Sequence, residues 1–122
     1  MISFRVDGVP IPQGSMKVIN GHIIHSQGSA LAVWRSSIAI EAKRAGCRPI
    51  NGAVFINLLF SMPRPKTVKR PSPTVPPDLD KLIRGVLDAL TAVAYVDDGQ
   101  VVEITAIKVY GEPFVEITLN EG

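Results

Sequence analysis

The sequence contains one cysteine and no long apolar run. These shortages argue against a disulfide-stabilised fold, a cysteine-based zinc site and a membrane span. Cys47 has no partner for an internal disulfide and no CxxC neighbour for a zinc site, so we expect a free thiol. The longest apolar run, residues 53–60, is broken by Asn57 and is far shorter than the roughly 20 residues of a membrane span. Because residues 1–7 alternate like a strand and lack the pattern of a signal peptide, we expect a cytoplasmic protein without a membrane segment.

Acidic residues are scarce in the first part of the chain, although the formal net charge is only +2. Residues 1–70 contain ten Lys or Arg and two Asp or Glu, whereas residues 71–122 contain three and nine. Lys and Arg neutralise phosphates and supply most non-specific affinity for nucleic acids, so this segregation indicates nucleic-acid contact. A solvated surface of mixed charge explains the same distribution, and charge alone leaves both interpretations open.

Hydrophobic periodicity predicts a single α+β domain over residues 1–122, with a mixed sheet and two helices. We expect helices at residues 29–45 and from residue 79 to about 93, where apolar residues recur every three or four positions. Strands are expected at residues 2–9, 17–19, 22–25, 53–62, 101–110 and 113–119. Asn20-Gly21 indicates a tight turn between the two short strands, and Gly111-Glu112 indicates that the last two strands form a closing antiparallel hairpin.

The stretch from residue 63 to residue 77 is the least regular, with six prolines and four cations. Prolines favour an extended, polyproline-like backbone. No internal repeat or second apolar core follows it, so we interpret residues 63–77 as a long basic loop within one domain and not as a linker.

Two acidic pairs flank the second predicted helix. Asp78 and Asp80 stand at its start, and an extended backbone there turns both carboxylates to the same outer side. Asp97 and Asp98 stand between the helix and the next predicted strand. If that strand returns beside the helix start, three carboxylates converge, and oxygen ligands of this kind suit a hard divalent ion such as Mg²⁺. Such an ion can activate water and offset the charge that builds on a phosphodiester during hydrolysis.

The acidic residues also have purely structural explanations. Asp80 fits a helix N-cap, and the sequence of residues 97–99 is common in tight turns. Arg84 and Asp88 follow Asp80 at four-residue spacing, which fits a surface ladder of ion pairs. The alternative is that Arg84 lies near a metal site and stabilises negative charge on phosphate.

Three segments resemble the RusA-type Holliday junction resolvases that are common in phages and prophages. They are Pro-Asp-Leu-Asp-Lys-Leu at residues 77–82, Val-Leu-Asp-Ala-Leu-Thr at 86–91 and Val-Asp-Asp-Gly-Gln-Val-Val at 96–102. Weaker similarity reaches upstream to residues 9–12, so the resemblance spans nearly the whole chain. It implies a metal site formed by Asp78, Asp80 and Asp98, with Asp97 as a neighbour that supports the ligands.

The resemblance further implies an endonuclease that resolves four-way DNA junctions in recombination and repair, with Mg²⁺ or Mn²⁺ as cofactor. It also implies a homodimer, because paired cuts in opposed strands need two equivalent sites. Phosphate contacts would orient the branched DNA without reading its sequence. The predicted DNA contacts are all cations: Arg64, Lys66, Lys69, Arg70, Lys81 and Lys17.

Two positions depart from the family pattern, which usually has Asn after Asp-Leu-Asp and Lys four residues past the second Asp. This chain has Lys81 and Arg84 at these positions. Arginine keeps its charge but does not shuttle a proton, so Arg84 is assigned to the catalytic set as a support for phosphate charge. Arg84 in place of Lys leaves one rival hypothesis, a catalytically silent junction-binding protein. A second rival is an interaction protein whose acidic motifs are only caps and turns.

Overall fold

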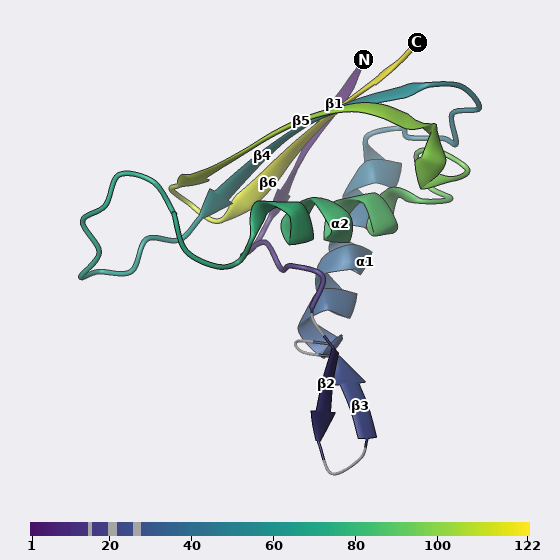
Figure 1. The fold of residues 1–122 in the computed structure, drawn as a ribbon. Coiled ribbons are helices and arrows are strands. Elements are labelled where there is room, and N and C mark those ends of the chain that lie inside the picture. Colours follow the sequence, from purple (N-terminus) through teal and green to yellow (C-terminus); the bar gives the residue numbers. More distant parts are fainter. Residues whose placement is uncertain (15, 20–21, 26–27) are drawn as a thin grey trace.

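A four-stranded sheet organises the chain. The computed structural model describes residues 1–14, 16–19, 22–25 and 28–122, with side chains outside residues 15–27. The strand order is β1 (Ile2–Asp7), β6 (Phe114–Glu121), β4 (Val54–Met62) and β5 (Val101–Tyr110) (Figure 1). β4 runs parallel to β5 and antiparallel to β6, and β1 runs antiparallel to β6. The predicted α+β fold with a mixed sheet is therefore confirmed.

The last two strands do not pair with each other, so the predicted closing hairpin is wrong. β4 lies between β5 and β6 and is hydrogen-bonded to both. The connection after β5 therefore crosses the end of β4, where the Gly111 N–H donates to the Met62 carbonyl at 2.9 Å. A Cβ at Gly111 would lie 2.7 Å from the Ser61 hydroxyl oxygen, so the close crossing requires glycine. The turn residues predict that the chain reverses, but the apolar character of β4 places that strand in the centre.

Both helices cover the same face of the sheet (Figure 1). α1 (Gly28–Arg44) and α2 (Leu79–Leu90) pack against each other, with α1 also contacting β1 and α2 contacting β5. Their buried side chains recur at the predicted helical spacing: Leu31, Trp34, Ile38 and Ala42 in α1, and Leu82, Val86 and Leu90 in α2. α2 ends before the expected residue 93 because Ala92 has a φ of 70°, which is incompatible with a right-handed helix.

The remaining segments surround this core. β2 (Met16–Ile19) and β3 (His22–His25) form the predicted antiparallel pair, which extends away from the sheet (Figure 1), while Asn20 and Gly21 lie outside the described residues. The described stretch from residue 63 to residue 78 contains no helix or strand, and a short 3₁₀ helix, η1 (Asp98–Gln100), leads into β5. Among the described residues, no helix has both the length and the apolar character to cross a membrane.

Candidate active site

The start of α2 presents two carboxylates that have no partner in the described part of the chain. Asp78 occupies the N-cap position in an extended conformation, yet its side chain makes no capping hydrogen bond. Asp80 lies in the first turn, and both residues are exposed. The cap explanation proposed for Asp80 therefore does not apply, because the cap position belongs to Asp78. Negative charge near a helix N-terminus is favourable, which stabilises both carboxylates without using their oxygens.

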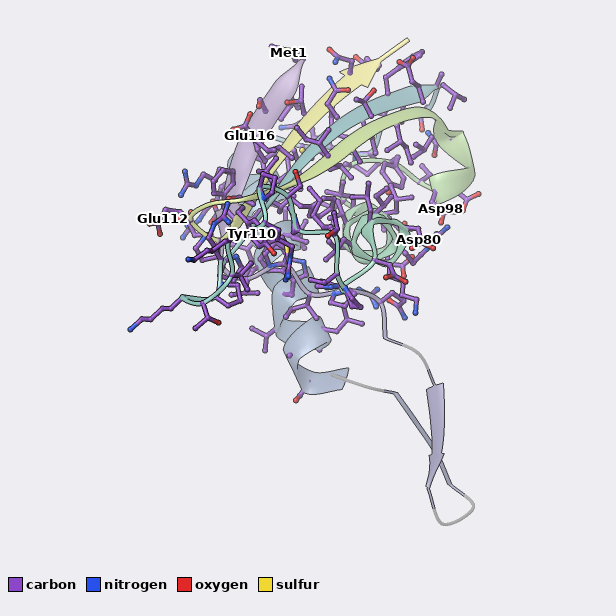
Figure 2. The ribbon with its side chains drawn as sticks, turned by 60° about the vertical axis from the view of Figure 1, so that its left-hand side comes forward. Met1, Asp80, Asp98, Tyr110, Glu112 and Glu116 are labelled. Atoms are coloured by element: carbon purple, nitrogen blue, oxygen red, sulfur yellow. The ribbon has the colours of Figure 1, made fainter. Side chains whose placement is uncertain are left out.

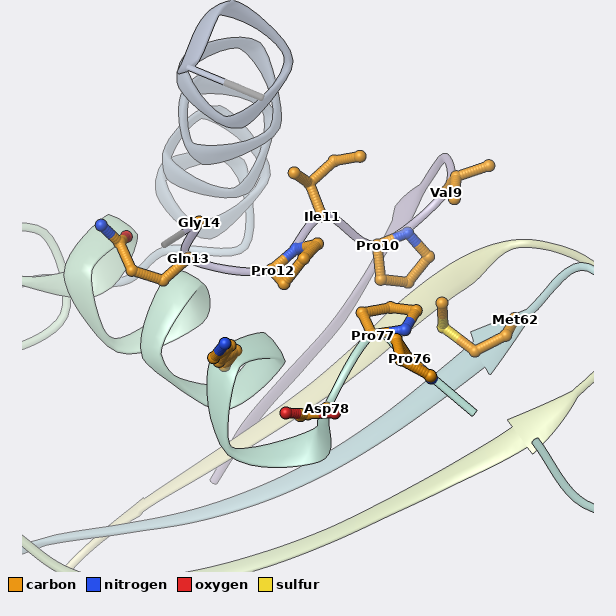
Figure 3. A pocket seen from close by; sticks show the side chains of 11 residues that line it. Val9, Pro10, Ile11, Pro12, Gln13, Gly14, Met62, Pro76, Pro77 and Asp78 are labelled. Carbon is orange, nitrogen blue, oxygen red and sulfur yellow. The ribbon is translucent and has the colours of Figure 1, made fainter. Parts of the chain in front are cut away.

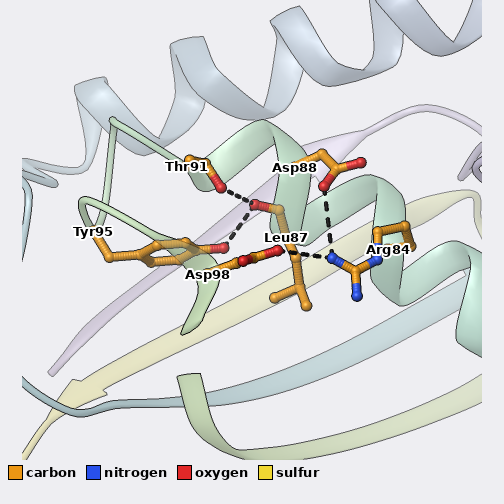
Figure 4. Close-up of polar contacts among 6 residues, drawn as sticks. All are labelled: Arg84, Leu87, Asp88, Thr91, Tyr95 and Asp98. Carbon is orange, nitrogen blue, oxygen red and sulfur yellow. Dashed lines mark hydrogen bonds and ion pairs between the residues drawn. The ribbon is translucent and has the colours of Figure 1, made fainter. Parts of the chain in front are cut away.

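Asp98 approaches the same helix from η1 and contacts Arg84. The Arg84 Nη1 donates a hydrogen bond to the Asp98 Oδ2 at 2.8 Å and lies 3.7 Å from the Asp88 Oδ1 (Figure 4). Asp80 and Arg84 are four residues apart in α2 and so share one face of it. Of the ion pairs predicted along α2, the described residues show the one between Arg84 and Asp88. The second ion pair of Arg84 is with Asp98 of η1. Figure 2 shows Asp80 and Asp98 on the same side of the molecule.

The three predicted metal ligands do not form a closed cluster. Among the described residues, no group of three or more acidic, histidine or cysteine side chains lies close enough to hold a metal ion. The donor chemistry still fits a hard divalent cation, since the oxygens of Asp78 and Asp80 have no partner among the described residues and Mg²⁺ is commonly held by one or two carboxylates plus substrate phosphates. Asp98 is the exception, because its carboxylate accepts a hydrogen bond from Arg84.

Gln100 fixes the backbone that carries Asp98. Its Oε1 accepts hydrogen bonds from the N–H groups of Val96 and Asp97, both at 2.9 Å. Its Nε2 donates to the carbonyls of Ile50 at 2.6 Å and Gly52 at 2.9 Å. One amide thus ties the acidic loop to the segment before β4. The exposed Asp97 contributes its backbone N–H to this network. Nothing in the sequence pattern singles out Gln100 for the role.

Tyr95 attaches the same loop to α2. Its side chain is fully buried, and its hydroxyl donates to the Leu87 carbonyl at 2.7 Å, next to a second hydrogen bond from the Thr91 hydroxyl at 2.9 Å (Figure 4). Burial raises the pKa of Tyr95 far above its usual range, and the carboxylates of Asp98 and Asp88 act in the same direction. The hydroxyl therefore remains a donor at every physiological pH, and the loop remains attached.

The four cations of the basic loop fall into two pairs. Arg64 stacks over the Tyr110 ring and donates to the Arg70 carbonyl, while Arg70 Nε donates to the Tyr110 hydroxyl at 2.9 Å. These two arginines hold the loop against β5. Lys66 and Lys69 are exposed and have no hydrogen bond or ion pair within the described residues. Of the predicted DNA contacts, this second pair has its ammonium groups free for phosphate.

The other two predicted DNA contacts are Lys81 and Lys17. Lys81 lies in the first turn of α2 and is exposed, close to Asp80 in the chain. The side chain of Lys17 lies outside the described residues, although its backbone is part of β2.

Lys108 of β5 holds the chain just before Asp78. Its Nζ donates to the carbonyls of Val75 at 2.9 Å and Pro77 at 2.8 Å. A lysine in an alternating strand has the appearance of a surface cation, so nothing in the sequence pattern indicates this role. Two side chains near opposite ends of β5 therefore hold the acidic segments: Lys108 holds the one with Asp78, and Gln100 holds the one with Asp98.

Comparison with known proteins gives two matches. The sequence model of the endodeoxyribonuclease RusA family matches residues 7–120, a range that includes both acidic segments. The chain is also similar to the uncharacterized protein YqaN of Bacillus subtilis (strain 168), with 31% identity over 138 aligned residues that cover 98% of this chain and 96% of that protein.

Proposed function

This chain belongs to the RusA family of endodeoxyribonucleases, which resolve Holliday junctions, and we propose that Asp78, Asp80 and Asp98 form its catalytic centre. The observation that carries the proposal is the pair of carboxylates at the start of α2, Asp78 and Asp80, which have no partner among the described residues. Arg84 lies on the same helix and donates a hydrogen bond to Asp98. Two carboxylates side by side at a helix start offer the oxygen ligands that a hard divalent cation uses together with substrate phosphates, so their position supports a cation as the ligand.

The cofactor in this proposal is Mg²⁺, with Mn²⁺ as a substitute of similar ligand preference. Asp78 and Asp80 would hold it, and Asp98 would join them by giving up its hydrogen bond with Arg84. When bound, a divalent ion lowers the pKa of a water and offsets charge on the phosphodiester. Asp97 supports this arrangement through its backbone bond to Gln100.

Arg84 binds phosphate in this proposal. Its guanidinium is half exposed and already lies between two carboxylates, Asp88 and Asp98, so it is held in place before DNA arrives. A planar guanidinium can bind two phosphate oxygens at once, and it supplies positive charge where the leaving group develops negative charge. Because arginine remains protonated, Arg84 stabilises charge and another group or solvent carries the proton.

DNA contact is assigned in this proposal to exposed cations. Lys66 and Lys69 contact phosphates of the junction arms, and Lys81 contacts the cleaved strand next to Asp80. Arg64 and Arg70 shape the loop that presents the two lysines. We further propose that residues 1–122 act as one endonuclease domain and that two copies form a homodimer that makes paired cuts in recombination and repair.

The test is cleavage of labelled four-way junctions by the wild type beside Asp80→Asn, with Mg²⁺, Mn²⁺ or Ca²⁺. The wild type is expected to make symmetric nicks, and Asp80→Asn is expected to bind junctions but not cut them. Size measurement by light scattering tests the dimer independently. Equal cleavage by the wild type and Asp80→Asn would remove Asp80 from the catalytic centre.

The Arg84–Asp98 hydrogen bond favours a second candidate function, a junction-binding protein without nuclease activity. In that case the guanidinium permanently occupies the Asp98 carboxylate, and the metal site stays incomplete. The variant Arg84→Lys restores the usual family residue and separates the two functions. A silent wild type that gains cleavage as Arg84→Lys would establish the binding protein.

A further inference from the structure

A hollow of about 470 Å³ lies beside Asp78, between the segment that follows β1 and the start of α2 (Figure 3). Most of its lining is apolar, and Asp78 and Lys81 supply the charged groups. The apolar walls are formed by Val9, Pro10, Ile11, Pro12, Met62 and Pro77. Its size is within the range of small-molecule sites, which are mostly apolar with a few polar groups.

The wall that follows β1 is fixed against α2. The Gln13 N–H donates to the Lys81 carbonyl at 3.0 Å. Gly85 lets the Ile11 carbonyl approach the helix so closely that a Cβ would lie 3.2 Å from that oxygen. This wall therefore has its position before any ligand binds.

The opposite wall is fixed against β5. Lys108 holds the carbonyls of Val75 and Pro77, and the proline rings allow little backbone rotation. A site whose walls are both fixed loses little conformational entropy on binding. The hollow is thus preformed, which distinguishes it from an accidental gap between mobile segments.

We propose that this hollow binds one nucleobase of the cleaved strand, next to the phosphate that is cut. The inference rests on the proposed function, because it needs the scissile phosphate at the carboxylates of Asp78 and Asp80. A base linked to that phosphate is tethered within reach of the hollow. The lining contains one carboxylate, Asp78, and one cation, Lys81, so it has no net charge to draw a phosphate inside, whereas an uncharged, flat base suits walls of proline and aliphatic groups.

The chemistry of the walls also sets the kind of recognition. Proline and aliphatic side chains pack against the flat face of a base, so this contact binds an unstacked nucleotide by apolar burial. Removing a base from its stack costs least where the duplex is already interrupted, as at a branch point. The hollow therefore favours strands at a junction over continuous duplex, in addition to the phosphate contacts.

Abasic substitution tests the proposal directly. The cut position of the wild type is first mapped on a fixed four-way junction, and each nucleotide beside it is then replaced singly by an abasic analogue. One position is expected to lower kcat/KM roughly tenfold, the effect of losing one stacked base. If no abasic position slows cleavage, the base site is absent even though the nuclease is active. A wild type that cuts no junction would instead overturn the proposed function.

A filling variant connects the effect to the hollow. Val9→Trp places a large side chain at a half-exposed position of the lining, and Val33→Trp is the matched control on the exposed side of α1. Val9→Trp is expected to slow cleavage of the normal junction and to lose the additional abasic effect. The control should behave as the wild type on both substrates. An abasic effect that persists unchanged in folded Val9→Trp would overturn the assignment to this hollow.

Fluorescence provides a readout that needs neither cleavage nor a pocket variant. 2-Aminopurine at the mapped position is bound by Asp80→Asn, which keeps the junction intact. Its emission is expected to rise several-fold as the base leaves the stack, whereas the same label two nucleotides away should change little. An unchanged signal at every position beside the cut would contradict the proposal.

Discussion

The Nζ of Lys108 lies 2.8 Å from the carbonyl oxygen of Pro77, the residue immediately before Asp78. Since it also bonds the Val75 carbonyl, this one ammonium group sets how the chain enters α2. β5 and the start of α2 are far apart in the sequence, so the bond joins a strand to a candidate ligand that lies some thirty positions upstream. Lys108 therefore acts on Asp78 through the backbone, as a positioning residue.

Lys108→Met is expected to lower kcat by about 10- to 100-fold, the usual effect of losing a group that orients a ligand. Junction affinity should stay near the wild-type value, because the ammonium faces protein carbonyls and not DNA. Lys108→Arg keeps donors for both carbonyls and should recover part of the rate. Single-turnover cleavage and gel-shift titration measure the two quantities, with the exposed Lys43→Met as control. A loss of affinity equal to the loss of rate would show a DNA contact instead.

Gln100→Met keeps the length of the side chain but removes all four hydrogen bonds of the amide. These bonds are exposed or only partly buried, and an intramolecular hydrogen bond contributes about 0.5–1.5 kcal/mol, so the free energy of unfolding should fall by about 1–3 kcal/mol in total. Urea denaturation measures this change, and Mn²⁺ titration by electron paramagnetic resonance measures metal affinity. We expect weaker Mn²⁺ binding in the folded variant, because Asp98 loses its fixed backbone. Unchanged stability would mean that the bond from Tyr95 to Leu87 holds the loop without Gln100.

Lys66→Met and Lys69→Met test the division of the basic loop into two pairs. Each should reduce the slope of log affinity against log salt concentration by about 0.9, the value for one phosphate contact. Raising the enzyme concentration should restore cleavage, since neither lysine lies at the acidic residues. Affinity measured at several salt concentrations decides the matter. A salt slope identical to that of the wild type would move the phosphate contacts elsewhere.

Gly111→Ala tests the crossing over β4. The added Cβ would lie 2.7 Å from the Ser61 Oγ, so the strand end must shift, at a cost of about 1–3 kcal/mol of unfolding free energy. Ser61→Ala removes the atom that clashes, and the double variant should recover much of the stability. Thermal and urea denaturation of the three variants form a double-mutant cycle. Additive losses would indicate that the hydroxyl and the glycine do not meet.

Local periodicity predicts most of the fold because each element buries one side. The spacing of Leu31, Trp34 and Ile38 indicates α1, and the apolar run of β4 indicates a central strand. The strand order cannot be predicted in this way. Gly111 indicates that the chain reverses, but contacts distant in sequence decide which strand pairs with β5.

The site is predicted by its acidic motifs but not by the groups that orient them. Asp78 and Asp80 are adjacent to a helix start in any plausible fold, so they are accessible to sequence analysis. Lys108, Gln100 and Arg70 look like surface polar residues, because a side chain that bonds a distant carbonyl has the same sequence pattern as one that faces solvent. The Arg84–Asp98 contact likewise joins two segments whose closeness depends on the return of the chain after α2.

β5 is an edge strand of the sheet, and within the described part of the chain it is hydrogen-bonded along one side only, to β4. Edge strands open in local fluctuations that leave the hydrophobic core folded. Lys108 lies in this edge strand, and Gln100 lies directly before it. Fraying of β5 would therefore loosen both contacts together and leave Tyr95 as the attachment of the Asp98 loop to α2, so warming should reduce cleavage at temperatures where the hydrophobic core is still folded.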